Sequence, residues 1–121
     1  MTQTILTVDD SRTMRDMLRM ALVEAGFNVV QAVDGVHGLE VLQDSMPDVI
    51  VTDINMPKMD GFGLIEAVRK DAKYRKVPIL VLTTESEGPK RNLARDAGAT
   101  GWIVKPFDPD QLISTINKVA P

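Results

Sequence analysis

The chain has 121 residues, a formal net charge of −3 and no cysteine. We expect one domain spanning residues 1–121, large enough to bury roughly two-thirds of its unfolded surface around a single core. The lack of cysteine excludes disulfides and thiolate metal sites. The acidic balance argues against nucleic acid as a partner, because there is no basic surplus to release phosphate counterions. With no signal-like apolar run and none of membrane-spanning length, we expect a cytoplasmic protein without membrane insertion.

The start of the chain predicts a strand followed by a helix. Residues 4–8 form a short apolar run that stops at Asp9 and Asp10. Apolar residues then recur at the i, i+3, i+4 spacing that places side chains on one face of a helix. They are Met14, Met17, Leu18, Ala21, Leu22 and Ala25. We expect this stripe to face the core and Gly26 to follow the helix end.

The next part of the chain predicts two more strands around a second helix. Residues 28–33 alternate in polarity, which suits a strand at the edge of a sheet. Asp34 is a candidate N-cap for the helix that follows and runs up to residues 46–47. Its inner face is assigned to Val36, Leu39 and Leu42. Residues 48–52 form the third predicted strand, which leads directly to Asp53.

The remaining residues continue this alternation, with strands expected at residues 78–82 and 102–104. A third helix is indicated by the apolar residues Leu64, Ile65 and Val68. A fourth is expected to begin at Gly88-Pro89 and to end at Ala97-Gly98. A fifth is expected to follow the cap Asp108-Pro109 and to turn Leu112, Ile113 and Ile116 inward. Strands that alternate with helices predict the α/β class, with a parallel sheet covered on both faces and right-handed crossovers.

Functional side chains follow four of the five predicted strands. Asp9 and Asp10 follow the first, Asp53 the third, Thr83 the fourth and Lys105 the fifth. All C-terminal ends of a parallel sheet lie at the same edge, with neighbouring strands about 4.8 Å apart. If the strand order is 2-1-3-4-5, the three carboxylates could share one cation, with Thr83 adjacent. Lys105 would be roughly 10 Å away along the backbone, a gap that its flexible side chain can bridge.

This grouping of side chains suits phosphoryl chemistry. Three close carboxylates raise one another's pKa, and a hard dication such as Mg²⁺ would resolve that conflict. Lys105 adds a movable positive charge and Thr83 adds a hydroxyl donor. Together they suit a site where a carboxylate attacks a phosphoryl group and the product charge must be held. A structural acidic cluster is the alternative, but it would require a coincidence at four strand ends.

Four motifs, taken in order, resemble the receiver domains of two-component response regulators, and in particular the single-domain chemotaxis type. The motifs lie at residues 8–12, 53–61, 82–85 and 101–107, and the resemblance covers essentially the whole chain. It implies a flavodoxin-like, CheY-like fold: a five-stranded parallel sheet of order 2-1-3-4-5 with five helices.

The resemblance also implies how the acidic residues divide their work. Asp53 would be the phosphoacceptor. Asp9, Asp10 and Asp53 would hold Mg²⁺ together with the backbone carbonyl of Asn55, and Asp10 and Asp53 would do so directly.

Further roles are implied for the residues around them. Thr83 would hydrogen-bond the phosphoryl group, and Lys105 would pair with it and precede a cis peptide bond to proline. Trp102 stands where the family carries a switch aromatic. Asn55 and Glu85 occupy the positions that tune dephosphorylation in the family.

The partners follow from the same resemblance. A histidine kinase would donate the phosphoryl group to a monomer that then binds the flagellar motor switch protein through the face made by the fourth helix, fifth strand and fifth helix. A phosphatase is a further expected partner. A phosphate sink and a phosphorelay shuttle remain alternatives for the output. A Mg²⁺-dependent aspartyl-phosphate phosphohydrolase is a third, although such enzymes place an acid two residues beyond the nucleophile, where this chain has Asn55.

Overall fold

The computed structural model describes residues 2–121, in which strands and helices alternate along the chain. The strands are β1 (Thr4–Val8), β2 (Asn28–Ala32), β3 (Val49–Thr52), β4 (Ile79–Thr83) and β5 (Gly101–Val104). The helices are α1 (Arg12–Glu24), α2 (Gly35–Ser45), α3 (Gly61–Lys70), the short 3₁₀ helix η1 (Ala72–Tyr74), α4 (Gly88–Ala97) and α5 (Pro109–Val119). The predicted elements are therefore all present, with strand ends displaced by one residue at β2, β3, β4 and β5.

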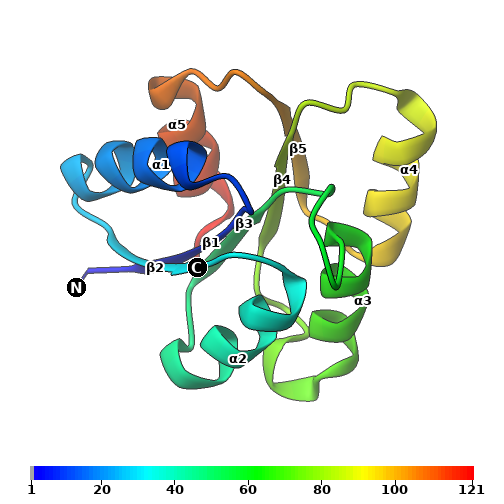
Figure 1. Ribbon diagram of the computed structural model, residues 1–121. Coiled ribbons are helices and arrows are strands. Elements are labelled where there is room, and N and C mark those ends of the chain that lie inside the picture. The colour runs from blue at the N-terminus through cyan, green and yellow to red at the C-terminus, as the bar shows by residue number, and fades with distance from the viewer. Residues whose placement is uncertain (1) are drawn as a thin grey trace.

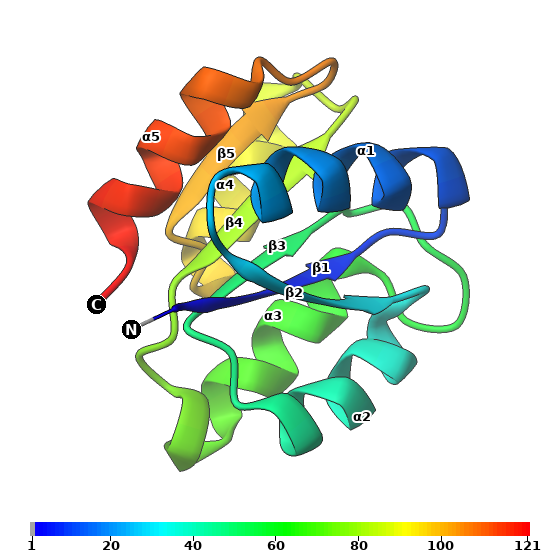
Figure 2. The same ribbon diagram turned by 90° about the vertical axis from the view of Figure 1, so that its left-hand side faces the viewer.

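The five strands form one parallel sheet in the order β2-β1-β3-β4-β5, which confirms the predicted fold class and topology. Helices α1 and α5 cover one face of the sheet, and α2, α3 and α4 cover the other (Figures 1 and 2). Because every strand points the same way, the C-terminal ends of β1, β3, β4 and β5 meet at one edge. The residues predicted to carry the chemistry follow these ends.

The core is divided by the sheet into two layers. Successive strand residues point to opposite faces, so Leu6 and Ile50 pack toward α2 and α3, while Ile5 and Val49 pack toward α1 and α5. Strands β1, β3 and β4 are buried almost throughout, which explains their continuous apolar sequences. The partly exposed β2 lies at the sheet edge, as its alternating sequence predicts.

The predicted inner face of α1 is only partly correct. Leu18 and Leu22 are buried, but Met17 is 49% exposed and Ala25 is exposed. The apolar stripe of six residues is therefore wider than the side of α1 that packs on the sheet. Met17 lies instead along a groove between α1 and α5 that Ile113 also lines.

The predicted inner face of α2 also needs correction, because Val36 is 40% exposed. The buried residues of this helix are Gly35, Gly38 and Leu42. Two glycines therefore occupy part of the face that was assigned to larger apolar residues, and they let the start of α2 approach its neighbours closely.

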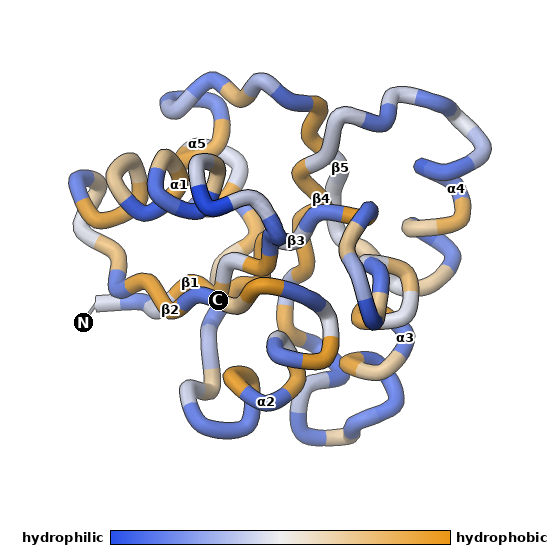
Figure 3. Tube along the Cα trace, in the orientation of Figure 1, coloured by the Kyte–Doolittle hydropathy of each residue, from blue (hydrophilic) through white to orange (hydrophobic). Residues whose placement is uncertain are grey.

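Helix α4 packs against the core through Ala94 and is also held at its C-terminal end. It is mostly hydrophilic (Figure 3), and its buried residue is Ala94. At its C-terminal end the Arg69 guanidinium of α3 donates to the Gly98 carbonyl at 2.9 Å. The same guanidinium reaches the carbonyls of Tyr74, Arg75 and Val77, which lead into β4. None of the helices in residues 2–121 is long and apolar enough to cross a membrane.

We expect Arg69→Met to lower the free energy of unfolding by about 2 kcal/mol, because partly buried carbonyls would lose a charged donor. Urea unfolding measures this difference. Arg91→Met, at an exposed position of α4, removes the same charge as a control. A loss for Arg69→Met no larger than that of the control would contradict the structural role of these hydrogen bonds.

Candidate functional site

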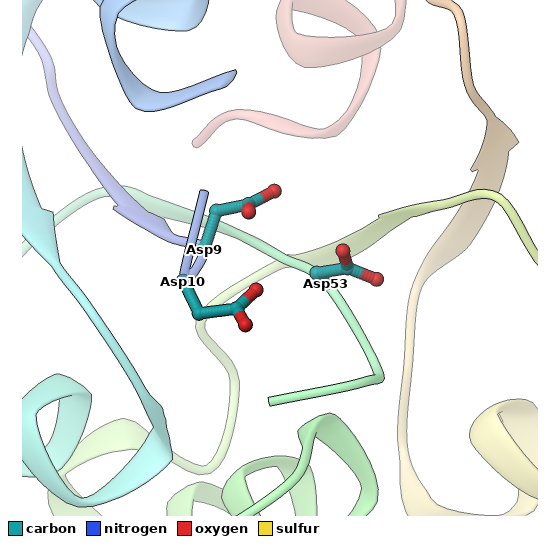
Figure 4. Close-up of side chains that lie close together, drawn as sticks. All are labelled: Asp9, Asp10 and Asp53. Carbon is teal, nitrogen blue, oxygen red and sulfur yellow. The ribbon is translucent and has the colours of Figure 1, made fainter. Parts of the chain in front are cut away.

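Three carboxylates meet where β1 and β3 end. Val8 and Thr52 are partners in the β1–β3 register, so Asp9 and Asp53 follow side by side. Asp9 and Asp53 are buried, whereas Asp10 is exposed. Each offers a carboxylate oxygen within 4.8 Å of the other two. Figure 4 shows the three side chains extending from the two strand ends into the same space, as the sequence predicted.

Lys105 reaches this carboxylate group from the end of β5. Its ammonium lies 2.8 Å from Asp53 Oδ2 and 2.9 Å from Asp9 Oδ2, so the side chain does bridge the expected gap. Burial lowers the pKa of Lys105, but hydrogen bonds to Asp53 and Asp9 outweigh it, and the pKa lies above its usual value. The lysine therefore stays charged and offsets part of the negative charge. Its peptide bond to Pro106 is cis, as expected.

The Asp53 carboxylate is also held by the loop that follows it. Its Oδ1 accepts a hydrogen bond of 2.6 Å from the backbone N–H of Ile54. The loop closes on itself where Gly61 N–H donates to the Ile54 carbonyl at 2.8 Å. A Cβ atom at Gly61 would collide with the Asp53 carbonyl oxygen, so glycine is required here. Asn55 is one of the residues of this closed loop, which runs from residue 54 to residue 61.

Glu85 connects the remaining predicted residues. Its backbone N–H approaches the hydroxyl of the fully buried Thr83 at 3.4 Å, and its carbonyl accepts a 3.1 Å hydrogen bond from the Trp102 indole. Its carboxylate accepts from the Asn55 amide at 3.2 Å and pairs with Lys90 of α4 at 3.1 Å. Hydrogen bonds from Lys90 and then Asn55 lower the pKa of Glu85.

The predicted site residues thus form two groups at one edge of the sheet. The first contains Asp9, Asp10, Asp53 and Lys105, and the second contains Asn55, Thr83, Glu85 and Trp102. Sequence reasoning missed Lys90 as a member. It lies five residues beyond Glu85 across the start of α4, and no periodic spacing signals a contact across a loop.

The donor set fits a hard divalent cation. Carboxylate oxygens are the ligands that Mg²⁺ prefers, and a site with an exposed member leaves room for the waters that Mg²⁺ retains. In this structure the Lys105 ammonium contacts one carboxylate oxygen each of Asp9 and Asp53, which such an ion would also use.

Comparison with known proteins agrees with the fold. The family of response regulator receiver domains matches residues 5–117. The chain belongs to the response regulator receiver domain family. Its structure is similar to that of the chemotaxis protein CheY4 of Vibrio cholerae, with 43% sequence identity, a TM-score of 0.94 and coverage of 98% of this chain and 99% of that chain.

A more distant solved structure is the receiver domain of a sensor histidine kinase from Pseudomonas aeruginosa, which has a magnesium ion coordinated in its active-site cleft. It is 25% identical, with a TM-score of 0.91 and coverage of 98% of both chains.

Curated relatives are longer proteins of several kinds. A probable transcriptional regulator, ycf27, of Guillardia theta is 39% identical, over 95% of this chain and 44% of its own length. The sensor histidine kinase CheAY of Helicobacter pylori is 34% identical, over 94% of this chain and 14% of its own length. The chain thus spans less than half the length of these relatives, and it shares with them the receiver domain.

We expect Lys105→Met to bind Mg²⁺ at least about threefold more tightly, because a like charge and a competitor for two carboxylates are removed. Isothermal titration calorimetry measures the affinity. Lys90→Met removes the same charge from a lysine that contacts Glu85 instead, and it should change the affinity less. Unchanged or weaker binding by Lys105→Met would show that the lysine does not compete with the ion.

Proposed function

We propose that Asp53 accepts a phosphoryl group from a histidine kinase, with Mg²⁺ held by Asp9, Asp10, Asp53 and the backbone carbonyl of Asn55. The observation that carries this proposal is the position of the Asp53 carboxylate. It is buried at a strand end, beside two further carboxylates, and it is paired with a charged lysine. A carboxylate without a catalytic task would be costly to keep among like charges.

The transfer itself needs little from the protein beyond position and charge. One oxygen of Asp53 forms a bond to phosphorus while the bond from phosphorus to the kinase imidazole nitrogen breaks, and the imidazole takes up a proton from solvent. Bound Mg²⁺ would neutralise charge on the phosphoryl oxygens. Lys105, already 2.8 Å from Asp53, pairs with the product, and the Thr83 hydroxyl donates to it.

The negative charge gained on Asp53 is about one unit, so its effect on the rest of the molecule must be local. Once the Thr83 hydroxyl turns toward the phosphoryl group, it moves relative to the Glu85 N–H that approaches it in this structure. Glu85 in turn contacts Trp102 through its carbonyl and α4 through Lys90. Phosphorylation thereby changes the face formed by α4, β5 and α5, as a shift between two populated states.

We expect acetyl phosphate and Mg²⁺ to add one phosphoryl group to the wild-type protein, and none to Asp53→Asn, because the amide is not a nucleophile. Intact-protein mass spectrometry measures the addition. Asp44→Asn, an exposed aspartate of α2, serves as the control and should be modified normally. The same reaction should change the fluorescence of Trp102, the single tryptophan.

Two results would contradict this proposal. Modification of Asp53→Asn at the wild-type level would move the phosphoacceptor elsewhere. Continuous turnover of small phosphomonoesters with Mg²⁺ would instead support the phosphohydrolase alternative.

For the output we propose chemotaxis, with the flagellar motor switch protein bound by the α4–β5–α5 face. The face offers an exposed apolar residue, Val104, which is 42% exposed at the end of β5. Arg91 and Arg95 of α4 line a groove together with Trp102 of β5 and add positive charge to this face. A short apolar and acidic segment of the partner would match this combination.

We expect a pull-down of motor switch protein to capture the phosphorylated form and not the unmodified form. Val104→Ser should weaken capture about tenfold by removing an apolar contact. Val36→Ser is the control, because Val36 is similarly exposed, at 40%, but lies at the start of α2. Failure of both forms to bind would favour a phosphate sink or a phosphorelay shuttle.

A further inference from the structure

The loop between β3 and α3 is held from outside by the first residue of α2. The backbone N–H of Gly35 donates to the carbonyl of Met59 at 3.1 Å. A Cβ atom on Gly35 would lie 2.6 Å from that carbonyl oxygen and 2.7 Å from Met59 Cγ. The two segments are therefore as close as an α-carbon without a side chain permits.

The conformation of α2 does not itself require glycine at this position. Gly26 and Gly98 have positive φ angles, but Gly35 is not among the residues with a positive φ. An alanine would fit the helix and even favour it by about 1 kcal/mol. The steric restriction at Gly35 therefore comes from the loop.

The loop depends on such a support because it makes a tight and partly strained turn. Lys58 adopts a left-handed backbone with φ of 67°, and Met59 N–H bonds back to the Pro57 carbonyl at 2.8 Å. Among the described residues, Gly35 supplies the backbone hydrogen bond that reaches residues 55–59 from another element. Asn55 reaches out of the loop through its side chain, to Glu85.

We propose that Gly35 is a positioning residue, which fixes the loop so that the backbone carbonyl of Asn55 points to the metal site. This inference rests on the proposed role of that carbonyl as a Mg²⁺ ligand. An alanine would push against a backbone atom, which cannot rotate away as a side chain can. The Met59 carbonyl must then move, and the closed loop moves with it. The substitution in α2 would therefore displace the Asn55 carbonyl, which lies in the loop between β3 and α3.

The test compares three glycine variants by titration calorimetry with Mg²⁺ and by backbone amide NMR. Gly35→Ala should bind Mg²⁺ about tenfold more weakly and shift the amide signals of residues 54–60, as expected when a support of a ligand is disturbed. Gly63→Ala contacts the flexible Met59 side chain instead, at 3.0 Å, and Gly88→Ala meets nothing within 4 Å. Both controls should bind within about twofold of wild type.

A measurement on the wild-type protein covers the case in which Gly35→Ala does not fold. If Gly35 and the metal ligand are coupled, saturating Mg²⁺ must also strengthen the Gly35 hydrogen bond, because coupling is reciprocal. On addition of saturating Mg²⁺, hydrogen exchange of the Gly35 amide should slow at least about fivefold more than exchange of the Tyr74 amide. The Tyr74 amide donates to the Asp71 carbonyl before the start of β4, away from the carboxylates.

Equal slowing of both amides, or wild-type affinity in a folded Gly35→Ala, would overturn the inference and leave the proposed function intact. No Mg²⁺ binding by the wild-type protein would overturn the proposed function itself.

Discussion

Negative charge gathered at the ends of two neighbouring strands is the constraint on which the rest of this structure depends. Asp9 and Asp53 are buried close to each other and to Asp10, an arrangement that repulsion would disperse if nothing opposed it. The opposing charge comes from Lys105, which follows a strand two places from that of Asp53 and three from that of Asp9. The parallel sheet brings these residues together from distant parts of the sequence, because its strands all end at one edge.

The surrounding backbone restricts how this group can respond to a ligand. Asp53 is fixed by the N–H of Ile54 and by the ammonium of Lys105, so its carboxylate has little freedom before any reaction. Helix α4 has a different kind of attachment. Its C-terminal end is held to α3 by Arg69, while its first turn is held to Glu85 by one partly exposed ion pair. A partly exposed ion pair contributes little free energy, so the first turn is the end more easily released.

Much of the site could be predicted from the sequence because its residues follow apolar strands. The runs before Asp53 and Thr83 are buried on both sides, and their ends are sharply marked by the change to polar residues. The reach of Lys105 could also be predicted, since it depends only on strand spacing and side-chain length. The cis peptide bond before Pro106 was expected from the family resemblance alone.

The errors have a common physical origin in contacts between elements that the local sequence does not encode. Met17 has the spacing of a core residue, but its side of α1 is not covered by the sheet and lines a groove beside α5. Val36 was assigned inward because large apolar residues usually are, whereas the close approach of Met59 selects Gly35 for that face. The contacts of Glu85 with Asn55 and Lys90 join the loop after β4 to the loop after β3 and to the first turn of α4. The periodicity of a helix or strand cannot predict contacts between such segments.

The hydrogen bond of Trp102 has a consequence for how this receiver can diversify. The indole donates to the main-chain carbonyl of residue 85, not to its side chain. Any amino acid at position 85 presents that carbonyl, whereas the contacts with Asn55 and Lys90 belong to the glutamate alone. An exchange of residue 85 would therefore remove the contacts with Asn55 and Lys90 and keep the carbonyl that the Trp102 indole contacts. The contact of α4 and the β3–α3 loop with this residue can therefore change independently of its contact with β5.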